Sequence, residues 1–207
     1  MIVRFAGFGG QGIVLSSYIL GKSAVVDGKK AIQNQSYGSE SRGGECRGDV
    51  IISHEAIYEL EPTEFDVLVA MTQPAYERFV GSLKPGGVLI LESDLVIADE
   101  RLEPAGISTF RIGATDIAHK KFGRKIMANM ILLGFMNTLL ELVSDRALES
   151  SIEETVPKGT EKLNLKAMRE GRRLARRKQK SAGGGSVKPT RRKPRSLSEK
   201  AAEEAGA

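Results

Sequence analysis

The sequence predicts an α/β fold in which helices cover both faces of an open, doubly wound, mostly parallel β-sheet. Three observations predict it. An apolar run at residues 1–6 leads through a glycine loop, Gly7–Gly12, into a helical pattern. Residues 65–71 are almost continuously apolar, which is typical of a parallel strand buried on both faces. Strand and helix patterns then alternate, so we expect ligands to bind at the carboxyl ends of the strands.

The apolar period and the turn residues of each segment give the expected elements. Strands are expected at residues 1–6, 30–33, 49–52, 65–71, 88–91 and 107–112. Helices are expected at residues 13–27, 73–83 and 126–143, then from a Ser144 cap to Thr155, and finally as an amphipathic C-terminal helical segment after a break at Pro157–Thr160. Residues 34–46 are polar and glycine-rich, which predicts a long loop. Helix 13–27 is expected to cover the sheet with a broad apolar face made of Val14, Leu15, Tyr18, Ile19, Val25 and Val26.

Composition limits the class of protein. The chain has 207 residues, 41% of them apolar, and no apolar stretch near ~18 residues, so we expect no membrane helix. The N-terminus lacks the features of a secretion signal, and we expect a cytoplasmic protein. The one cysteine, Cys46, cannot by itself hold zinc or an iron–sulfur cluster; a redox-active thiol beside Arg42 and Arg47 is the alternative to a structural cysteine. His54 and His119 lack ligand spacing, so no metal site and no catalytic residue are expected.

Positive charge is concentrated at the C-terminus. Residues 1–166 contain 18 Lys and Arg against 22 Asp and Glu, a net charge of −4, whereas residues 167–207 contain 13 against 4, a net charge of +9. We expect one folded domain over residues 1–178 and a disordered basic tail over residues 179–207, because the tail has almost no apolar residues to bury. No aromatic residues alternate with the basic ones, which disfavours nucleic acid as a partner of the tail.

The loop G-F-G-G-Q-G at residues 7–12 has glycines where a backbone turns tightly or approaches a ligand, and the helix after it offers free N–H groups to an anion. Strand, glycine loop and helix in this order are typical of a Rossmann-like fold, but a simple tight turn also explains the glycines. Ile32 and Gln33 stand where a nicotinamide-binding protein usually has an acidic residue, so ordinary NAD binding is disfavoured. The same absence disfavours an S-adenosylmethionine-dependent methyltransferase as the function, although the turn at residues 84–87 superficially resembles a turn found in that family. A non-catalytic nucleotide-binding or scaffold protein is a further alternative.

A second glycine-rich segment, Gln33–Gly44, precedes the strand at residues 50–53. In it Arg42 stands beside Gly43 and Gly44, and a guanidinium flanked by exposed backbone N–H groups can bind a phosphate or a carboxylate. Together with the opening loop, this segment predicts a two-sided anion site. The alternative for Arg42 is a salt bridge to a neighbouring glutamate.

The two segments together make the sequence similar to a known family. It resembles the gamma subunit, or gamma domain, of the 2-oxoacid:ferredoxin oxidoreductases, in the pyruvate/ketoisovalerate oxidoreductase catalytic-domain family. The matching stretches are G-F-G-G-Q-G at 7–12, Q-S-Y-G-S-E-S-R-G-G at 35–44, V-I-I-S at 50–53 and V-P-K-G-T-E-K-L-N at 156–164. The resemblance spans about residues 1–175, and the Q-S-Y-G form is most similar to the 2-oxoglutarate branch, with the pyruvate and branched-chain relatives close to it.

The resemblance implies a subunit, inactive alone, of an enzyme that converts a 2-oxo acid, coenzyme A and oxidised ferredoxin into acyl-CoA, carbon dioxide and reduced ferredoxin. It implies that thiamine diphosphate, magnesium and the iron–sulfur clusters are held by partner subunits, alpha and beta or alpha, beta and delta, and that this chain holds no cofactor. The resemblance implies that coenzyme A is a co-substrate and that ferredoxin binds the assembled complex.

The same resemblance implies which residues approach coenzyme A or a partner subunit. They are Gly7, Gly9, Gly10, Gln11, Gly12, Tyr37, Arg42, Gly43 and Gly44. On this hypothesis Gln11 supplies an amide and Arg42 pairs with a phosphate or carboxylate. For Tyr37 an anchor in a subunit interface is the alternative to a ligand contact.

Overall fold

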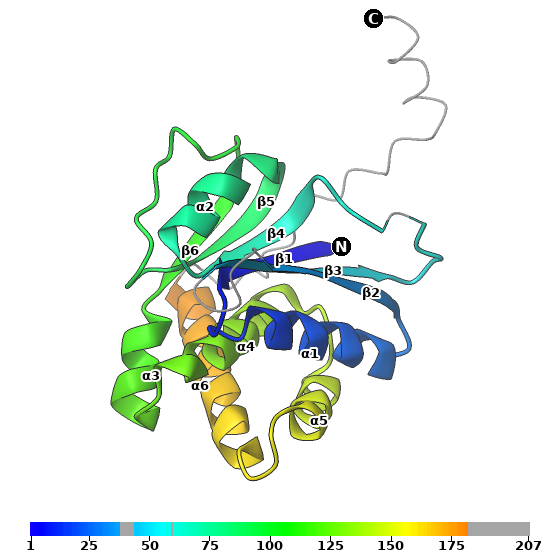
Figure 1. Cartoon of the computed structure of the whole chain (residues 1–207), viewed down its shortest axis with the longest axis vertical. Helices are drawn as coiled ribbons and strands as arrows, with labels where there is room; N and C mark the ends of the chain where they lie inside the picture. Colours follow the sequence, from blue (N-terminus) through cyan, green and yellow to red (C-terminus); the bar gives the residue numbers. More distant parts are fainter. Residues whose placement is uncertain (38–43, 59, 182–207) are drawn as a thin grey trace, which may run out of the picture.

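The computed structural model describes residues 1–37, 44–58 and 60–181, and its centre is a six-stranded sheet in the order β2-β3-β1-β4-β5-β6 (Figure 1). The strands are β1 (Ile2–Phe8), β2 (Lys30–Tyr37), β3 (Glu45–Ser53), β4 (Phe65–Ala70), β5 (Leu83–Glu92) and β6 (Ser108–Ile112). The helices are α1 (Ile13–Val26), α2 (Gln73–Phe79), α3 (Ala114–Phe122), α4 (Ala128–Leu140), α5 (Asp145–Thr155) and α6 (Glu161–Ser181), with single 3₁₀ turns at Val80–Ser82 and Lys125–Met127. The predicted α/β class and C-terminal helical segment are confirmed. The predicted tail lies outside the described residues beyond Ser181.

The sheet is mixed. Strands β1, β4, β5 and β6 run parallel, whereas β3 is antiparallel to both of its neighbours, β1 and β2. The prediction of a loop over residues 34–46 was wrong at both ends, because β2 continues to Tyr37 and β3 already begins at Glu45. Asn34 pairs with Asp49 and Tyr37 with Cys46, so the backbone ladder extends through polar residues on what is an edge strand.

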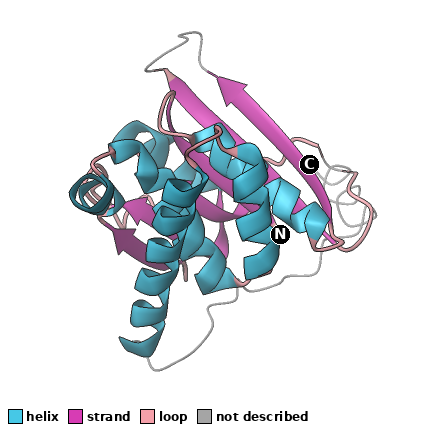
Figure 2. Ribbon diagram, turned by 90° about the horizontal axis from the view of Figure 1, so that it is seen from below, coloured by secondary structure: helices cyan, strands magenta, loops and turns pink. Residues whose placement is uncertain are grey.

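Side chains of the central strands alternate between two cores. Val3 and Phe5 of β1 point into the core shared with α1, α3, α4, α5 and α6, whereas Ile2 and Ala6 point into the core covered by α2. Figure 2, seen from below, shows the larger helical layer in front of the strands. The sheet therefore has helices on both faces, as predicted. Helix α2 covers one face, and the larger helical layer covers the other. No helix in the described parts of the chain is long and apolar enough to cross a membrane.

Helix α1 covers the sheet with a narrower face than predicted. Ile19 is buried, but Tyr18, Val25 and Val26 are 50%, 58% and 55% exposed. The small residues on its inner side let α1 lie close to β3, where the Ser17 side chain sits against Gly48. That close approach turns the outer part of the apolar face toward the surface.

The N-terminus of α5 is as predicted. Ser144 precedes the helix in an extended conformation, and its Oγ accepts a hydrogen bond from the backbone N–H of Ala147 at 3.1 Å. This side-chain cap satisfies one of the N–H groups that have no partner within the helix. The next element, α6, follows the predicted break at Pro157–Thr160.

A buried ion pair joins β1 to β3 on the α2 face of the sheet. Arg4 and Asp49 are directly paired across the two strands and are 3% and 4% exposed. Arg4 Nε and Nη2 donate to the two Asp49 carboxylate oxygens at 2.6 and 2.7 Å. The guanidinium also lies over the rings of Phe65 and Phe79, 4.5 and 4.9 Å from their centroids. Removing one partner leaves the other charge buried without its counter-charge, which is costly in a low-dielectric interior.

Replacing Asp49 by Asn is therefore expected to lower the free energy of unfolding by about 3 to 5 kcal/mol, measured by urea denaturation of the full chain. The matched control is Asp116→Asn, which breaks an exposed pair with Lys120 and should change stability by less than about 1 kcal/mol. Equal effects of the two substitutions would show that the buried pair has no special weight.

Candidate functional site

The two glycine-rich segments meet at the carboxyl edge of β1. Gly7 is paired with Cys46 of β3, and Cys46 is paired on its other side with Tyr37, the last residue of β2. Beyond the paired residues, the backbone N–H of Gly9 donates to the carbonyl of Gly44 at 2.9 Å. The structure thus brings the opening loop to the end of the second segment. Arg42 and Gly43 lie outside the described residues, and of Tyr37 only the backbone is described.

Gly12, the residue that directly precedes α1, has a backbone conformation that favours glycine. Its φ and ψ are 77° and 24°, in the left-handed region, and no side chain caps the helix. A Cβ atom on Gly12 would also overlap the side-chain amide of Asn129. The first N–H groups of α1 therefore lack intrahelical partners and a side-chain cap, at the positive end of the helix dipole. Such a helix N-terminus favours an anion, and the anion site itself stays a prediction.

The Gln11 side chain is turned back into the loop. Its Oε1 accepts a hydrogen bond from the backbone N–H of Phe8 at 2.7 Å, and its Nε2 donates to the carbonyl of Met71 at 3.4 Å. Both ends of the amide are thus engaged with β1 and with the residue that follows β4. Gln11 holds the loop in shape within this chain.

Asn129 supports the glycine loop through a hydrogen bond to Gly12. This residue was not identified from the sequence. It lies in the first turn of α4, is 2% exposed, and donates from Nδ2 to the carbonyl of Gly12 at 3.4 Å. Its Oδ1 accepts from the backbone N–H of Met130 at 2.7 Å. The available signal was an asparagine within the apolar period of residues 126–143, where a buried amide needs partners.

Two carboxylates lie at the carboxyl end of β5, which is separated from β1 by β4. Glu92, buried at the end of β5, accepts hydrogen bonds from the backbone N–H groups of Asp94 and Thr115 at 3.1 and 2.9 Å. Burial raises the pKa of Glu92 to about 7. Asp94 accepts from the backbone N–H of Asp116 at 2.7 Å. Both side chains thus bind the N-terminal turn of α3, which gives them a structural task.

The remaining titratable candidates do not form a catalytic group. Cys46 is buried, and burial raises the pKa of its thiol, which favours a structural cysteine over a redox-active one. Glu45 pairs with Arg78 of α2. His54 and His119 are exposed. Within residues 1–37, 44–58 and 60–181, no three His, Cys, Asp or Glu side chains lie close enough to hold a metal ion. What this edge offers to a ligand or partner is backbone N–H groups and close access to glycines.

Comparison with known proteins gives the family of the chain. The family model described as pyruvate ferredoxin/flavodoxin oxidoreductase matches residues 2–174. The chain belongs to this family. The resemblance predicted from the glycine loop and the Gln35–Gly44 segment is thereby confirmed.

Members of the pyruvate ferredoxin/flavodoxin oxidoreductase family resemble the chain over most of its length. The 2-oxoglutarate synthase subunit KorC of Methanothermobacter marburgensis is 44% identical over 182 residues, which are 86% of this chain and 98% of that protein. The subunit of the same name from Methanocaldococcus jannaschii is 40% identical over 175 residues, 84% of this chain and 93% of that protein. The matches cover nearly the whole length of both relatives, so the chain is similar to a whole subunit.

Solved structures agree with the fold and the family. The gamma subunit of a keto/oxoacid ferredoxin oxidoreductase from Geobacter sulfurreducens is 38% identical, with a TM-score of 0.73 over 85% of this chain and 98% of that chain. A 2-oxoglutarate:ferredoxin oxidoreductase from Magnetococcus marinus, solved with 2-oxoglutarate, coenzyme A and succinyl-CoA bound, is 25% identical, with a TM-score of 0.79. The match covers 92% of this chain and 32% of that longer chain, so the same domain occurs there within a larger polypeptide.

Substitution of Gly12 tests whether the loop depends on the missing side chain. Gly12→Ala adds a left-handed alanine and a clash with Asn129, and is expected to lower the free energy of unfolding by about 3 kcal/mol. Gly10→Ala is the control: its φ of 95° also favours glycine, but nothing lies within 4 Å of the added atom, and the expected cost is about 1 kcal/mol. In an Asn129→Ala background the cost at Gly12 should fall to that at Gly10, by urea denaturation. Equal costs at the two glycines in the wild-type background would contradict the close packing.

Proposed function

We propose that the chain is the gamma subunit of a 2-oxoglutarate:ferredoxin oxidoreductase, which forms succinyl-CoA and carbon dioxide from 2-oxoglutarate and coenzyme A and passes the electrons to ferredoxin. The observation that carries the proposal is the near full-length similarity, at 44% and 40% identity, to two subunits named for 2-oxoglutarate synthase. The bound 2-oxoglutarate, coenzyme A and succinyl-CoA of the Magnetococcus relative support the same substrate class.

In this proposal the reacting groups belong to partner subunits. Thiamine diphosphate with magnesium supplies the decarboxylation chemistry, and iron–sulfur clusters accept the electrons. The partners are alpha and beta subunits, or alpha, beta and delta. Cys46, the one cysteine of the chain, is buried with a raised pKa, which suits neither a cluster ligand nor a reactive thiolate. We infer a cytoplasmic complex.

The chain's own contribution is a shaped surface at the carboxyl edge of β1. Gly7, Gly9, Gly10 and Gly12 are proposed to let the backbone of the loop approach a ligand or a partner, and the first N–H groups of α1 are proposed to bind an anion there. Arg42, beside Gly43 and Gly44, is proposed to pair with a phosphate of coenzyme A or with a carboxylate. Tyr37 is proposed as a contact of the same ligand or of a partner subunit. Gln11 and Asn129 hold the loop in position for this task.

The proposal predicts that the purified chain alone forms no succinyl-CoA from 2-oxoglutarate, coenzyme A and oxidised ferredoxin. The complex that co-purifies with it from its native source is expected to contain thiamine diphosphate and iron, and to turn over. Its kcat/KM for 2-oxoglutarate should exceed that for pyruvate and for branched-chain 2-oxo acids by about tenfold or more.

The outcomes of this assay separate the parts of the proposal. Turnover by the isolated chain, or purification without cluster-bearing and thiamine-bearing subunits, would overturn the assignment as a gamma subunit. A preference of the complex for pyruvate would overturn the substrate and leave that assignment intact.

A further inference from the structure

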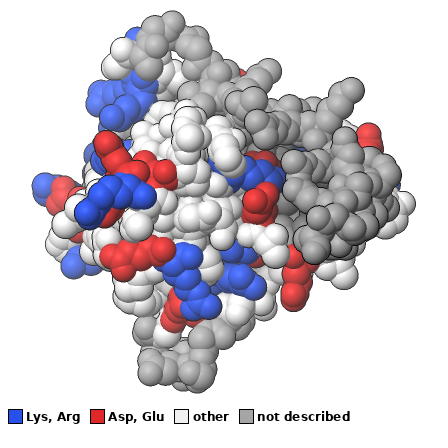
Figure 3. All heavy atoms as spheres, turned by 90° about the horizontal axis from the view of Figure 1, so that it is seen from above, with Lys and Arg blue, Asp and Glu red and all other residues white. Residues whose placement is uncertain are grey.

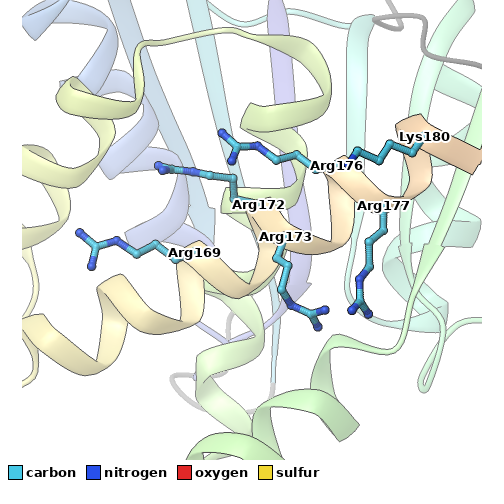
Figure 4. A pocket seen from close by; sticks show the side chains of 6 residues that line it. All are labelled: Arg169, Arg172, Arg173, Arg176, Arg177 and Lys180. Atoms are coloured by element: carbon cyan, nitrogen blue, oxygen red, sulfur yellow. The ribbon is translucent and has the colours of Figure 1, made fainter.

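Helix α6 carries a row of positive charges along one face. The residues repeat at the three- and four-residue spacing that places side chains on the same side of a helix. They line an open hollow of about 410 Å³ (Figure 4). We call this row the basic stripe. It consists of Arg169, Arg172, Arg173, Arg176, Arg177 and Lys180.

The opposite face of α6 fixes the stripe in place. Met168 and Ala175 are fully buried in the core that α6 shares with α4. A Cβ atom on Gly171 would overlap the carbonyl of Ile131 in α4, so the two helix backbones lie in close contact. A helix anchored in this way up to Ala175 presents its outer face at a defined place.

The first half of the stripe is already paired with carboxylates of this chain. Arg169 lies 2.7 Å from Glu149, and Arg172 lies 3.0 Å from Asp145 and 3.1 Å from Glu149. Arg173 pairs with Glu170 of its own helix. These contacts show the kind of group that the stripe binds, because the planar guanidinium matches the two oxygens of a carboxylate.

The second half has no such partners. Arg176, Arg177 and Lys180 are exposed, and in the part of the chain that the structure describes none of them has a carboxylate within salt-bridge distance. Like charges four residues apart destabilise a helix. These three residues follow residue 174, the last residue that the family model matches.

We propose that Arg176, Arg177 and Lys180 bind a row of carboxylates on the surface of another protein. Successive charges on a helix face are about 5 to 6 Å apart, a spacing that side chains on an acidic helix or strand can match. The site would continue the guanidinium–carboxylate pairing of the first half. This proposal is independent of the reaction proposed above.

The surroundings of the stripe favour an acidic protein over other anions. None of its residues is aromatic, so it provides no platform for stacking of nucleic-acid bases. None is apolar, so it provides nothing to enter a lipid bilayer. Backbone N–H groups within a helix are bonded to the preceding turn, so they add no contact to a phosphate beyond those that the side chains could make. Among the coloured side chains of the face drawn in Figure 3, by contrast, acidic and basic groups are interspersed.

The test measures binding of a fluorescein-labelled peptide of twelve glutamates to the full chain by fluorescence anisotropy at low salt. In the stripe variant, Arg176, Arg177 and Lys180 are all changed to Gln. The matched control changes Arg191, Arg192 and Lys193 to Gln, which removes the same charge from the C-terminal tail. We expect the stripe variant to bind the peptide at least about tenfold more weakly than the wild type, and the tail variant to remain within about threefold.

Two further probes decide the class of partner. These are a labelled twelve-nucleotide oligouridine and vesicles of phosphatidylcholine with phosphatidylserine. The proposal is overturned if the tail variant loses as much peptide binding as the stripe variant, or if the wild type does not bind the peptide. It is also overturned if RNA or vesicles bind more tightly than the peptide and lose that binding in the stripe variant. Unchanged circular dichroism and thermal midpoints of both variants confirm that α6 remains folded.

Discussion

The structure depends on a turn between β1 and α1 that has no room for a side chain at Gly12. The residue is held in a left-handed conformation directly over the Asn129 amide, which donates to its carbonyl. This contact joins the start of α1 to the start of α4, across 117 residues of sequence. Because α1 then lies along β3, the turn also fixes the position of the β2–β3 hairpin, whose end meets the loop through Gly9 and Gly44.

The two faces of the sheet contribute differently to the site. On one face, α4 is almost wholly buried between the sheet and α6, and it provides the support under the loop. On the other, Arg4 and Asp49 clamp β1 to β3 beneath α2 and keep the two strands in register. That register sets which residues of β3 stand beside the glycine loop, and so places Cys46 and Glu45 at the edge. A buried charge pair is a costly way to hold two strands, but it disfavours a slip that would expose either charge to an apolar core.

Much of the fold follows from local sequence signals, and the errors have physical causes. The apolar run of β4, the Ser144 cap and the break before α6 are encoded within a few residues, and they were predicted correctly. Helix α3 was not predicted, because only Ala114 and Ala118 are buried and its sequence has no strong apolar period. The length of β2 and β3 was underestimated. Residues 34–37 are polar, and it is their pairing with residues 46–49 of β3 that makes them part of a strand.

At the site, the glycine loop and its junction with the second segment were predictable from motif and topology. The inward turn of Gln11 and the support from Asn129 were not, because both depend on contacts with residues far away in sequence. The exposed apolar residues of α1 were assigned to the core for a related reason. Helical period identifies an apolar face, but the neighbours of the helix decide how much of that face is covered.

The central claim is that the carboxyl edge of β1 is where this subunit meets the ligand of the assembled enzyme. Hydrogen–deuterium exchange of the native complex, with and without coenzyme A, tests this claim directly. Amides in peptides covering residues 7–16 and 33–48 are predicted to exchange more slowly when coenzyme A is added, and those of residues 73–82 to be unchanged. Protection confined to the partner subunits, with no change in either edge peptide, would contradict it.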